Sequence, residues 1–247
     1  MHPFIDKAKT GKNHWWRYGI GLLISLLHLP VLFHLFLSHL RRVALPADIV
    51  DYYANFLYRA SALPVLLLVV RSIHQRPILT VLTASPRFRW KRMLFAFGVM
   101  LGLCTAFEGL NYLIDPANYY LSLKWIQFIP ALLFGLVFIT LQVLAEEALY
   151  RGYILQAFGL ATKNIPISAA ITILLFTGPH WGKIEGDEAV SMTYFCSFGL
   201  LLIVTTLLDN GVEVSTGIHT ANNIFSMLIV NSPSDSFPAP SVLAPIT

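Results

Sequence analysis

The stretch LAEEALYRGYI, residues 144–154, places two adjacent glutamates and an arginine inside one of the most apolar parts of the chain. A charged side chain in the hydrocarbon core of a bilayer is costly, so such residues are rare there and mark sites of function or of structural support. The stretch therefore predicts a polar site inside a membrane-embedded fold, and polar residues from other apolar segments are needed to complete it.

The composition is typical of a membrane protein. Of the 247 residues, 56% are hydrophobic and 12% are charged, whereas soluble globular proteins carry about 25% charged residues. Several apolar runs reach the length of about 20 residues that a helix needs to cross a bilayer. We therefore expect an all-α fold, a polytopic membrane helical bundle surrounded by the lipid bilayer, and not one large soluble core.

Hydropathy divides the chain into three parts. We expect a cytoplasmic N-terminal segment at residues 1–17, a membrane-embedded helical domain at 18–231 and a Pro/Ser-rich C-terminal tail at 232–247, whose composition is typical of disorder. The domain should contain about seven or eight transmembrane helices, with kinks at Pro30 in the first and Pro64 in the second. The seven that hydropathy predicts are residues 18–37, 53–70, 94–114, 128–150, 165–180, 191–208 and 212–230.

Basic residues cluster on one side of the predicted membrane. Lysines and arginines precede the first span and recur between the second and third spans, at residues 71–92, while they are sparse on the alternate side. Such clusters face the cytoplasm in membrane proteins, so the amino terminus should be cytoplasmic. The same clusters account for the net charge of +4, and no nucleic-acid partner is expected.

The charged residues within the spans differ in their expected surroundings. Glu147 and Arg151 are four residues apart on a predicted helix and share a face, whereas Glu146 is rotated from them by about 100°. The Glu147–Arg151 pair offsets much of its own desolvation, while Glu146 is left as a candidate general base. We interpret Arg59 and Glu108, in other spans, as packing or interfacial residues that could neutralise each other.

Two histidines occur in other apolar segments, each with a second residue four positions away. Phe176 and His180 lie in FTGPHW, and His219 and Asn223 lie in GIHTANNIF; each pair shares a face if its helix is regular. Glu146 and His180 are each about 15 residues, roughly 22 Å, from the predicted turn between their helices. His219 is about eight residues, roughly 12 Å, beyond the turn DNG. We expect these segments to line one cavity.

Each motif is weak by itself, because F-x-x-x-H or H-x-x-x-N occurs by chance in many membrane proteins. As an ordered set, E-E-x-x-x-R, F-x-x-x-H and H-x-x-x-N resemble the motifs of the CPBP family, also called the Abi family. That family includes type II CAAX prenyl endopeptidases and proteins of bacteriocin processing or immunity, and its core is usually described with eight membrane helices. The resemblance covers the motif core at residues 141–228 and implies an integral protein of a bacterial cytoplasmic membrane.

The resemblance implies an intramembrane, metal-independent glutamate peptidase that hydrolyses a membrane-associated or lipidated peptide or protein. Carried over to this sequence, Glu146 and His180 activate a water molecule, and His219 and Asn223 form the oxyanion hole. The site is supported by the remaining motif residues, which are Glu147, Arg151 and Phe176. Neither a metal nor another cofactor is then expected.

Three other interpretations stay open. A zinc-dependent membrane protease is one, since one glutamate and two histidines can ligate zinc, although the motif H-E-x-x-H is absent. A rhomboid-like serine peptidase is the second, but the sequence has no G-x-S-x-G motif. The third is a non-catalytic bacteriocin-immunity or membrane scaffold protein, in which the polar cluster serves binding or assembly alone.

Overall fold

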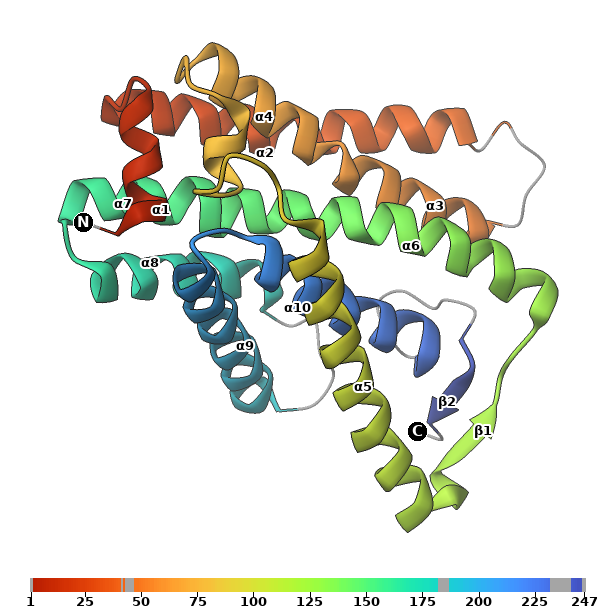
Figure 1. Cartoon of the computed structure of the whole chain (residues 1–247). Helices are drawn as coiled ribbons and strands as arrows, with labels where there is room; N and C mark the ends of the chain where they lie inside the picture. The colour runs from red at the N-terminus through yellow and green to blue at the C-terminus, as the bar shows by residue number, and fades with distance from the viewer. Residues whose placement is uncertain (1, 41, 43–46, 182–186, 232–240, 246–247) are drawn as a thin grey trace.

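The computed structural model describes residues 2–40, 42, 47–181, 187–231 and 241–245, which form a bundle of helices with one short β-ribbon (Figure 1). The predicted all-α membrane fold is confirmed. In chain order the elements are α1 (Pro3–Asp6), η1 (Lys7–Thr10), α2 (Trp15–Leu40), α3 (Ala47–Ala60), α4 (Ala62–Ser72), η2 (Ile78–Val81), α5 (Trp90–Ile114), η3 (Pro116–Asn118), β1 (Tyr119–Leu121), α6 (Trp125–Glu147), η4 (Ala148–Ile154), α7 (Leu155–Thr162), α8 (Ile165–Thr177), η5 (Gly178–His180), α9 (Glu188–Asp209), α10 (Glu213–Ile224), η6 (Phe225–Ile229) and β2 (Leu243–Pro245).

Within the described ranges, four helices are long and apolar enough to cross a membrane. They are Tyr53–Ser72, Trp90–Ile114, Trp125–Thr162 and Glu188–Asp209. The other three predicted spans also fall on helices: α2 has 26 residues, whereas α8 and α10 are shorter, with 13 and 12 residues. The protein is therefore an integral membrane bundle with helical segments where hydropathy predicts them. That seven or eight segments cross the bilayer stays a prediction.

The glutamate motif lies within the longest helix. α6, the π-helical segment η4 and α7 run without a break over Trp125–Thr162, a length of 38 residues, and extend across the whole molecule (Figure 1). At 1.5 Å per residue this helix is about 57 Å long, well beyond the roughly 30 Å of a hydrocarbon core. Its regular α geometry is interrupted at Ala148–Ile154, directly after the two glutamates, and π-helical turns are frequent at functional sites.

The second span is interrupted near its predicted kink. α3 ends at Ala60, and α4 begins at Ala62. Pro64 has no N–H group to donate to the carbonyl oxygen of Ala60, four residues earlier, so the helix loses one hydrogen bond of its ladder there. The interruption therefore occurs at Ser61, about one turn before the proline that causes it.

The amino-terminal segment and two interhelical turns meet at one end of the bundle. Lys12 N donates to the carbonyl oxygen of His74 at 2.8 Å, and Val212 N donates to that of Leu82, also at 2.8 Å. These bonds join the start of the chain, the connection between α4 and α5, and the turn between α9 and α10. The segments rich in basic residues therefore lie at the same end of the bundle.

His74 is the polar centre of this end. Its side chain is fully buried, with Nδ1 2.9 Å from the carbonyl oxygen of Lys12 and Nε2 2.7 Å from the hydroxyl of Tyr153. A carbonyl oxygen only accepts, so Nδ1 carries the proton and Nε2 accepts from Tyr153. Burial lowers the pKa of His74 from 6.5 to about 4. The neutral imidazole thus ties the amino-terminal segment to η4.

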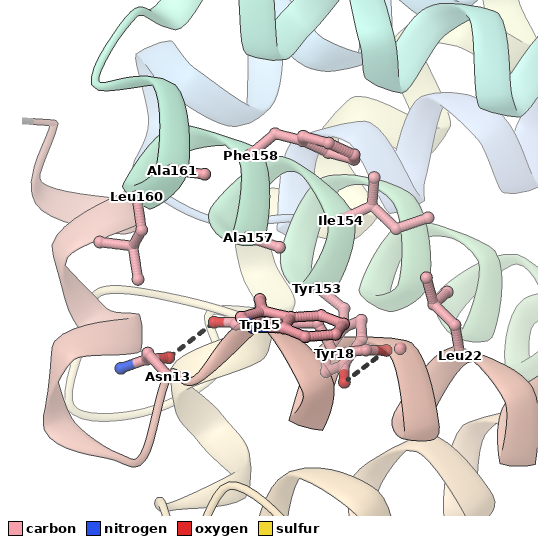
Figure 2. A pocket seen from close by; sticks show the side chains of 11 residues that line it. Asn13, Trp15, Tyr18, Leu22, Tyr153, Ile154, Ala157, Phe158, Leu160 and Ala161 are labelled. Carbon is pink, nitrogen blue, oxygen red and sulfur yellow. Dashed lines mark hydrogen bonds between the residues drawn. The ribbon is translucent and has the colours of Figure 1, made fainter.

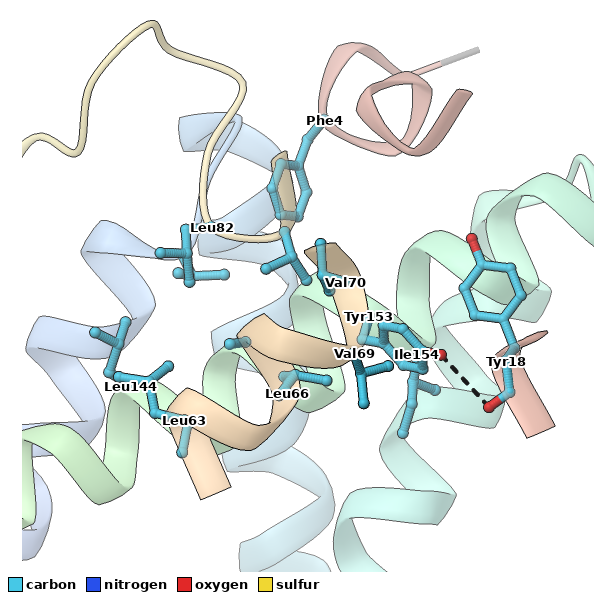
Figure 3. Packing of buried hydrophobic residues seen from close by; sticks show 14 residues of the cluster. Phe4, Tyr18, Leu63, Leu66, Val69, Val70, Leu82, Leu144, Tyr153 and Ile154 are labelled. Carbon is cyan, nitrogen blue, oxygen red and sulfur yellow. Dashed lines mark hydrogen bonds between the residues drawn. The ribbon is translucent and has the colours of Figure 1, made fainter. Parts of the chain in front are cut away.

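An apolar cluster packs the second span against the helix that carries the glutamates (Figure 3). On α4 it includes Leu63, Leu66 and Val69, and on the long helix it includes Leu144 and Tyr153. All five side chains are at most 9% exposed. Within a bilayer such contacts stabilise through close packing rather than through exclusion of water. The cluster therefore positions the glutamate motif relative to α4.

α5 is the least covered of the four long apolar helices. Only 11% of its most apolar 18-residue stretch is buried, and Phe95, Phe107 and Leu113 are each at least 67% exposed. Its buried side faces α10, where a Cβ atom added to Gly217 would lie 2.2 Å from the carbonyl oxygen of Met93. Only a glycine permits so close an approach. α10 is thus pressed against α5, and the rest of α5 is available to lipid.

The C-terminal tail contains a short strand. Leu243–Pro245 pairs in antiparallel register with Tyr119–Leu121, and Ala244 is 2% exposed. The expectation of a disordered tail is therefore wrong for this part, because the apolar residues that follow the Pro- and Ser-rich run pair with an extended segment ahead of α6. Residues 232–240 and 246–247, the rest of the predicted tail, lie outside the described residues.

A charged clasp joins the start of α5 to the turn between α9 and α10. Arg89 Nη2 lies 2.8 Å from Asp209 Oδ2 and 2.8 Å from Glu213 Oε2, and Arg89 Nε donates to Glu213 Oε1 at 2.9 Å. Glu213 is fully buried. Because Glu213 begins α10, the clasp holds the first turn of the helix that carries His219 and Asn223.

Replacement of Arg89 by glutamine should lower the unfolding temperature of the protein in detergent, because it leaves Glu213 buried without its cation. Breaking a buried ion pair costs about 3–5 kcal/mol, and we expect less here because the Arg89 side chain is 22% exposed. Arg87→Gln, which removes an exposed arginine two residues away, is the matched control and should unfold like the wild type. Equal unfolding temperatures for the two variants would contradict the role of the clasp.

Candidate active site

The acidic motif forms a buried network with the third motif. Glu147 and Arg151 are both fully buried, and Arg151 Nη1 lies 3.1 Å from Glu147 Oε1. The same oxygen lies 2.9 Å from His219 Nδ1. Because a carboxylate accepts, His219 donates through Nδ1, and Nε2 is left for a second contact. Residues that are separated by more than 60 positions in the chain are thereby in direct contact.

Phe176, from the second motif, packs against this network. Its side chain is 1% exposed, and the Arg151 guanidinium carbon lies 4.2 Å from the centroid of its ring, which is the geometry of a cation–π contact. The ring of His219 meets it nearly at a right angle, with 6.1 Å between centroids. Phe176 therefore contacts a residue from each of the other two motifs.

Glu146 occupies different surroundings from its neighbour. Its side chain is 23% exposed, whereas that of Glu147 is fully buried. Gln142 Nε2 donates to Glu146 Oε1 at 3.2 Å, and Glu146 Oε2 lies 3.9 Å from His219 Nε2, too far for a direct hydrogen bond. Glu146 is thus the accessible carboxylate of the two, oriented by an amide and placed beside an imidazole.

His180 is oriented by its own helical turn. Its Nδ1 lies 2.7 Å from the carbonyl oxygen of Phe176, so Nδ1 donates and the neutral ring keeps its lone pair on Nε2. The ring is also packed against Phe195, with 4.4 Å between centroids. The residue before it, Pro179, lies in the short 3₁₀ turn η5 that ends α8. Phe176 and His180 therefore remain in contact across one helical turn, despite the proline between them.

Glu146 and His180 line one cavity of about 320 Å³. Gln142 and Tyr150 contribute to the same wall, and residues of α2, α3 and α4 form the rest. This volume is at the lower end of the range for small-molecule sites. The structure thus brings the first and second motifs together around a space that can hold a water molecule and a short peptide segment.

The third motif lies behind this wall. His219 is 4% exposed, and neither it nor Asn223 is among the described residues that line the cavity. Asn223, one turn further along α10, is half-buried, and its side-chain oxygen accepts from Asn222 Nδ2 at 3.4 Å. His219 is linked to the cavity by Glu146, a lining residue whose Oε2 lies 3.9 Å from His219 Nε2. The expected convergence is therefore closer for His219 than for Asn223, whose oxyanion role stays a prediction.

The cavity residues that sequence patterns did not assign to the site include Ser25, Arg59 and Gln142. Gln142 lies four residues before Glu146, a helical spacing that could have identified it. Of the two span residues that we interpret as packing or interfacial, Arg59 lines the cavity, and Glu108 accepts from the Tyr119 hydroxyl at 2.7 Å; that they neutralise each other stays a prediction. An arginine within a membrane span is itself a signal of function.

A second cavity, of about 370 Å³, lies near the amino terminus and is lined by none of the motif residues (Figure 2). Trp15 and Tyr18 of α2 lie on one side, and Ile154 and Phe158 lie on the other. The Tyr18 hydroxyl donates to Asn13 Oδ1 at 2.6 Å. The lining is otherwise mostly apolar, so this cavity offers no pair of acid and base for hydrolysis.

The residues that the structure describes include no group of three or more His, Cys, Asp and Glu side chains that could hold a metal ion. His219 directs one ring nitrogen at Glu147, and Glu147 is already paired with Arg151. Metal independence stays a prediction and is tested by chelation.

Comparisons with known proteins agree with the motifs. Residues 119–225 match the family described as type II CAAX prenyl endopeptidase Rce1-like. The chain is also 29% identical to the uncharacterized protein YyaK of Bacillus subtilis (strain 168), in an alignment that covers 93% of this chain and 82% of that protein. No solved structure matches the chain significantly. Over residues 119–225, which include every motif of the site, the chain is therefore similar to the Rce1-like type II CAAX prenyl endopeptidases, in agreement with its motifs.

Proposed function

We propose that the protein is an intramembrane endopeptidase that hydrolyses a peptide bond of a membrane-associated or lipidated peptide or protein. The observation that carries this proposal is the cavity shared by Glu146 and His180, which come from different motifs and different helices. The buried Glu147–Arg151–His219 network lies directly behind it. The family match at residues 119–225 supports the same class of reaction.

In the proposed reaction, Glu146 removes a proton from a water molecule that is held between Glu146 and His180. The resulting hydroxide attacks the peptide carbonyl carbon, and Glu146 then transfers the proton to the leaving amine. His180 suits the task of holding the water, because its Nδ1 bond to Phe176 presents Nε2 as a hydrogen-bond acceptor. Neither a serine nor a cysteine nucleophile is required.

His219 and Asn223 are proposed to stabilise the oxyanion of the tetrahedral intermediate. His219 can donate through Nε2 only as an imidazolium, because Nδ1 already donates to Glu147. The Glu147 carboxylate stabilises this cation, and Arg151 and Phe176 hold the carboxylate and the helix in place. Donors in a site that excludes bulk water contribute more to transition-state stabilisation than they would in solution.

Loss of either water-activating residue should abolish cleavage. We expect Glu146→Gln and His180→Ala to lower the rate by at least about 100-fold, the usual contribution of general acid–base catalysis. The assay uses quenched fluorescent peptides in proteoliposomes, one with a farnesylated C-a-a-X end and one with a palmitoyl anchor. Glu108→Gln, which alters a membrane-span glutamate outside the cavity, is the matched control and should cleave normally.

Both variants must unfold at wild-type temperature and insert into the membrane for their loss of cleavage to count. Cleavage at the wild-type rate by either variant would contradict the proposed roles. If the wild type cleaves neither peptide while a phenotype or partner binding survives both substitutions, the immunity or scaffold interpretation is correct instead.

Thorough chelation should leave cleavage unchanged, because the proposed reaction assigns the water to Glu146 and His180 rather than to a metal. The measurement compares the rate before and after incubation with excess EDTA and 1,10-phenanthroline. Loss of activity that added Zn²⁺ restores would favour the zinc-dependent protease and sink the metal-independent mechanism.

The basic end of the bundle, with the amino terminus, is proposed to face the cytoplasm, since residues 71–92 and the amino-terminal segment meet there. A phosphatase reporter inserted at residues 183–188, of which 183–186 lie outside the described residues, should then be active on the opposite face. A fluorescent protein fused at the amino terminus should fold and fluoresce inside the cell. An inactive reporter with normal expression would reverse this orientation.

A further inference from the structure

Three aromatic side chains of α9 lie next to the histidines of the second and third motifs. The ring of Phe195 lies 4.4 Å from that of His180, and the ring of Phe198 lies 5.4 Å from that of His219, measured between centroids. Tyr194 is stacked on Phe198, with 5.9 Å between centroids and an angle of 4° between the ring planes. α9 thus supports both histidines of the proposed reaction, although it carries none of the motifs.

The Tyr194 hydroxyl starts a chain of two hydrogen bonds that ends at Asn223. It donates to Asn222 Oδ1 at 3.2 Å, and Asn222 Nδ2 donates to Asn223 Oδ1 at 3.4 Å. The second bond is long for an N–H···O contact, so it depends on how firmly Asn222 is held. Both asparagines are half-buried on α10. The phenol of α9 therefore reaches the third motif through a residue that is not part of it.

The direction of these bonds determines which end of the Asn223 amide is free. An asparagine amide has an oxygen that accepts and a nitrogen that donates two protons. Because Asn223 Oδ1 accepts from Asn222, Nδ2 is left to donate, and none of the described residues accepts from it. An oxyanion requires a donor. The opposite orientation of the amide would turn its oxygen toward the oxyanion and repel the negative charge.

We propose that Tyr194 is a positioning residue for the oxyanion donor Asn223 and that it acts through Asn222. This inference rests on the proposed function, in which Asn223 stabilises the tetrahedral intermediate. The Tyr194 hydroxyl holds Asn222, and Asn223 thereby keeps its N–H groups free before the substrate binds. A donor that is oriented in advance stabilises the transition state without reorganisation, so the chain of bonds should affect kcat rather than KM.

A purely structural role of Tyr194 predicts a different result. Its side chain is 42% exposed, and hydrogen bonds between side chains of neighbouring membrane helices also stabilise a bundle. If the bond to Asn222 does only this, its loss lowers the unfolding temperature and leaves the rate of the folded protein unchanged. Kinetics and unfolding therefore have to be measured on the same variants.

The test removes the hydroxyl and keeps the ring. With the same two quenched fluorescent peptides in proteoliposomes, Tyr194→Phe should lower kcat about 2- to 10-fold at unchanged KM, the effect of one neutral hydrogen bond. Asn222→Ala should give a similar loss, because it removes the donor to Asn223. Tyr112→Phe, which alters a tyrosine of α5 that is also 42% exposed, is the matched control and should cleave like the wild type.

Double variants show whether these residues act together. In an Asn223→Ala background, which lacks the donor, Tyr194→Phe should cause no further loss. Tyr194→Phe combined with Asn222→Ala should be no slower than Asn222→Ala alone, and this pair can be measured even where Asn223→Ala has too little activity. Unfolding temperatures in detergent identify variants that misfold. Asn222→Leu, which preserves more of the side-chain volume, replaces Asn222→Ala if that variant unfolds early.

Each outcome either supports or overturns the inference. A change in KM alone, multiplicative losses in the double variants, or a wild-type kcat for Tyr194→Phe would overturn it and leave the proposed function intact. A higher kcat would also overturn it, because the chain of bonds would then withdraw the Asn223 N–H groups from the site. If the wild type cleaves neither peptide, the proposed function fails and the inference fails with it.

Discussion

The buried ion pair between Glu147 and Arg151 is the contact on which the site depends. Two fully buried charges in a membrane helix are tolerated only together, since removal of one leaves the other uncompensated. The same pair supplies the acceptor for His219 and the cation above the ring of Phe176. Three segments that are distant in the chain are thus held at one point by two residues a single turn apart.

Two adjacent glutamates have different surroundings: Glu147 belongs to the buried network, and Glu146 faces the cavity. Glu147 points into the packed interface with α10, where its carboxylate pairs with Arg151 and accepts from His219. Glu146, rotated around the helix, reaches the cavity and is oriented by Gln142. The fold can therefore hold Glu147 rigidly without neutralising the carboxylate beside it, which a general base requires.

Local patterns in the sequence predicted the features that are themselves local. Hydropathy located the helices because a lipid-embedded backbone must satisfy its own hydrogen bonds, and a spacing of four identified the Glu147–Arg151 contact. The pairing of Leu243–Pro245 with Tyr119–Leu121 could not be predicted this way, because the two strands are far apart and the tail has a disorder-prone composition. That Arg59 lines the same cavity as Glu146 could not be predicted for a similar reason, because it results from packing between distant helices.

The open side of α5 makes the surrounding lipid a structural partner of the site. This helix has protein mainly along the face where Gly217 meets Met93, and most of its apolar surface is exposed. Acyl chains must complete its packing, and their length sets how the helix tilts. Because α5 supports the helix that carries His219 and Asn223, membrane thickness becomes one of the variables that determine the geometry around the reacting carbonyl.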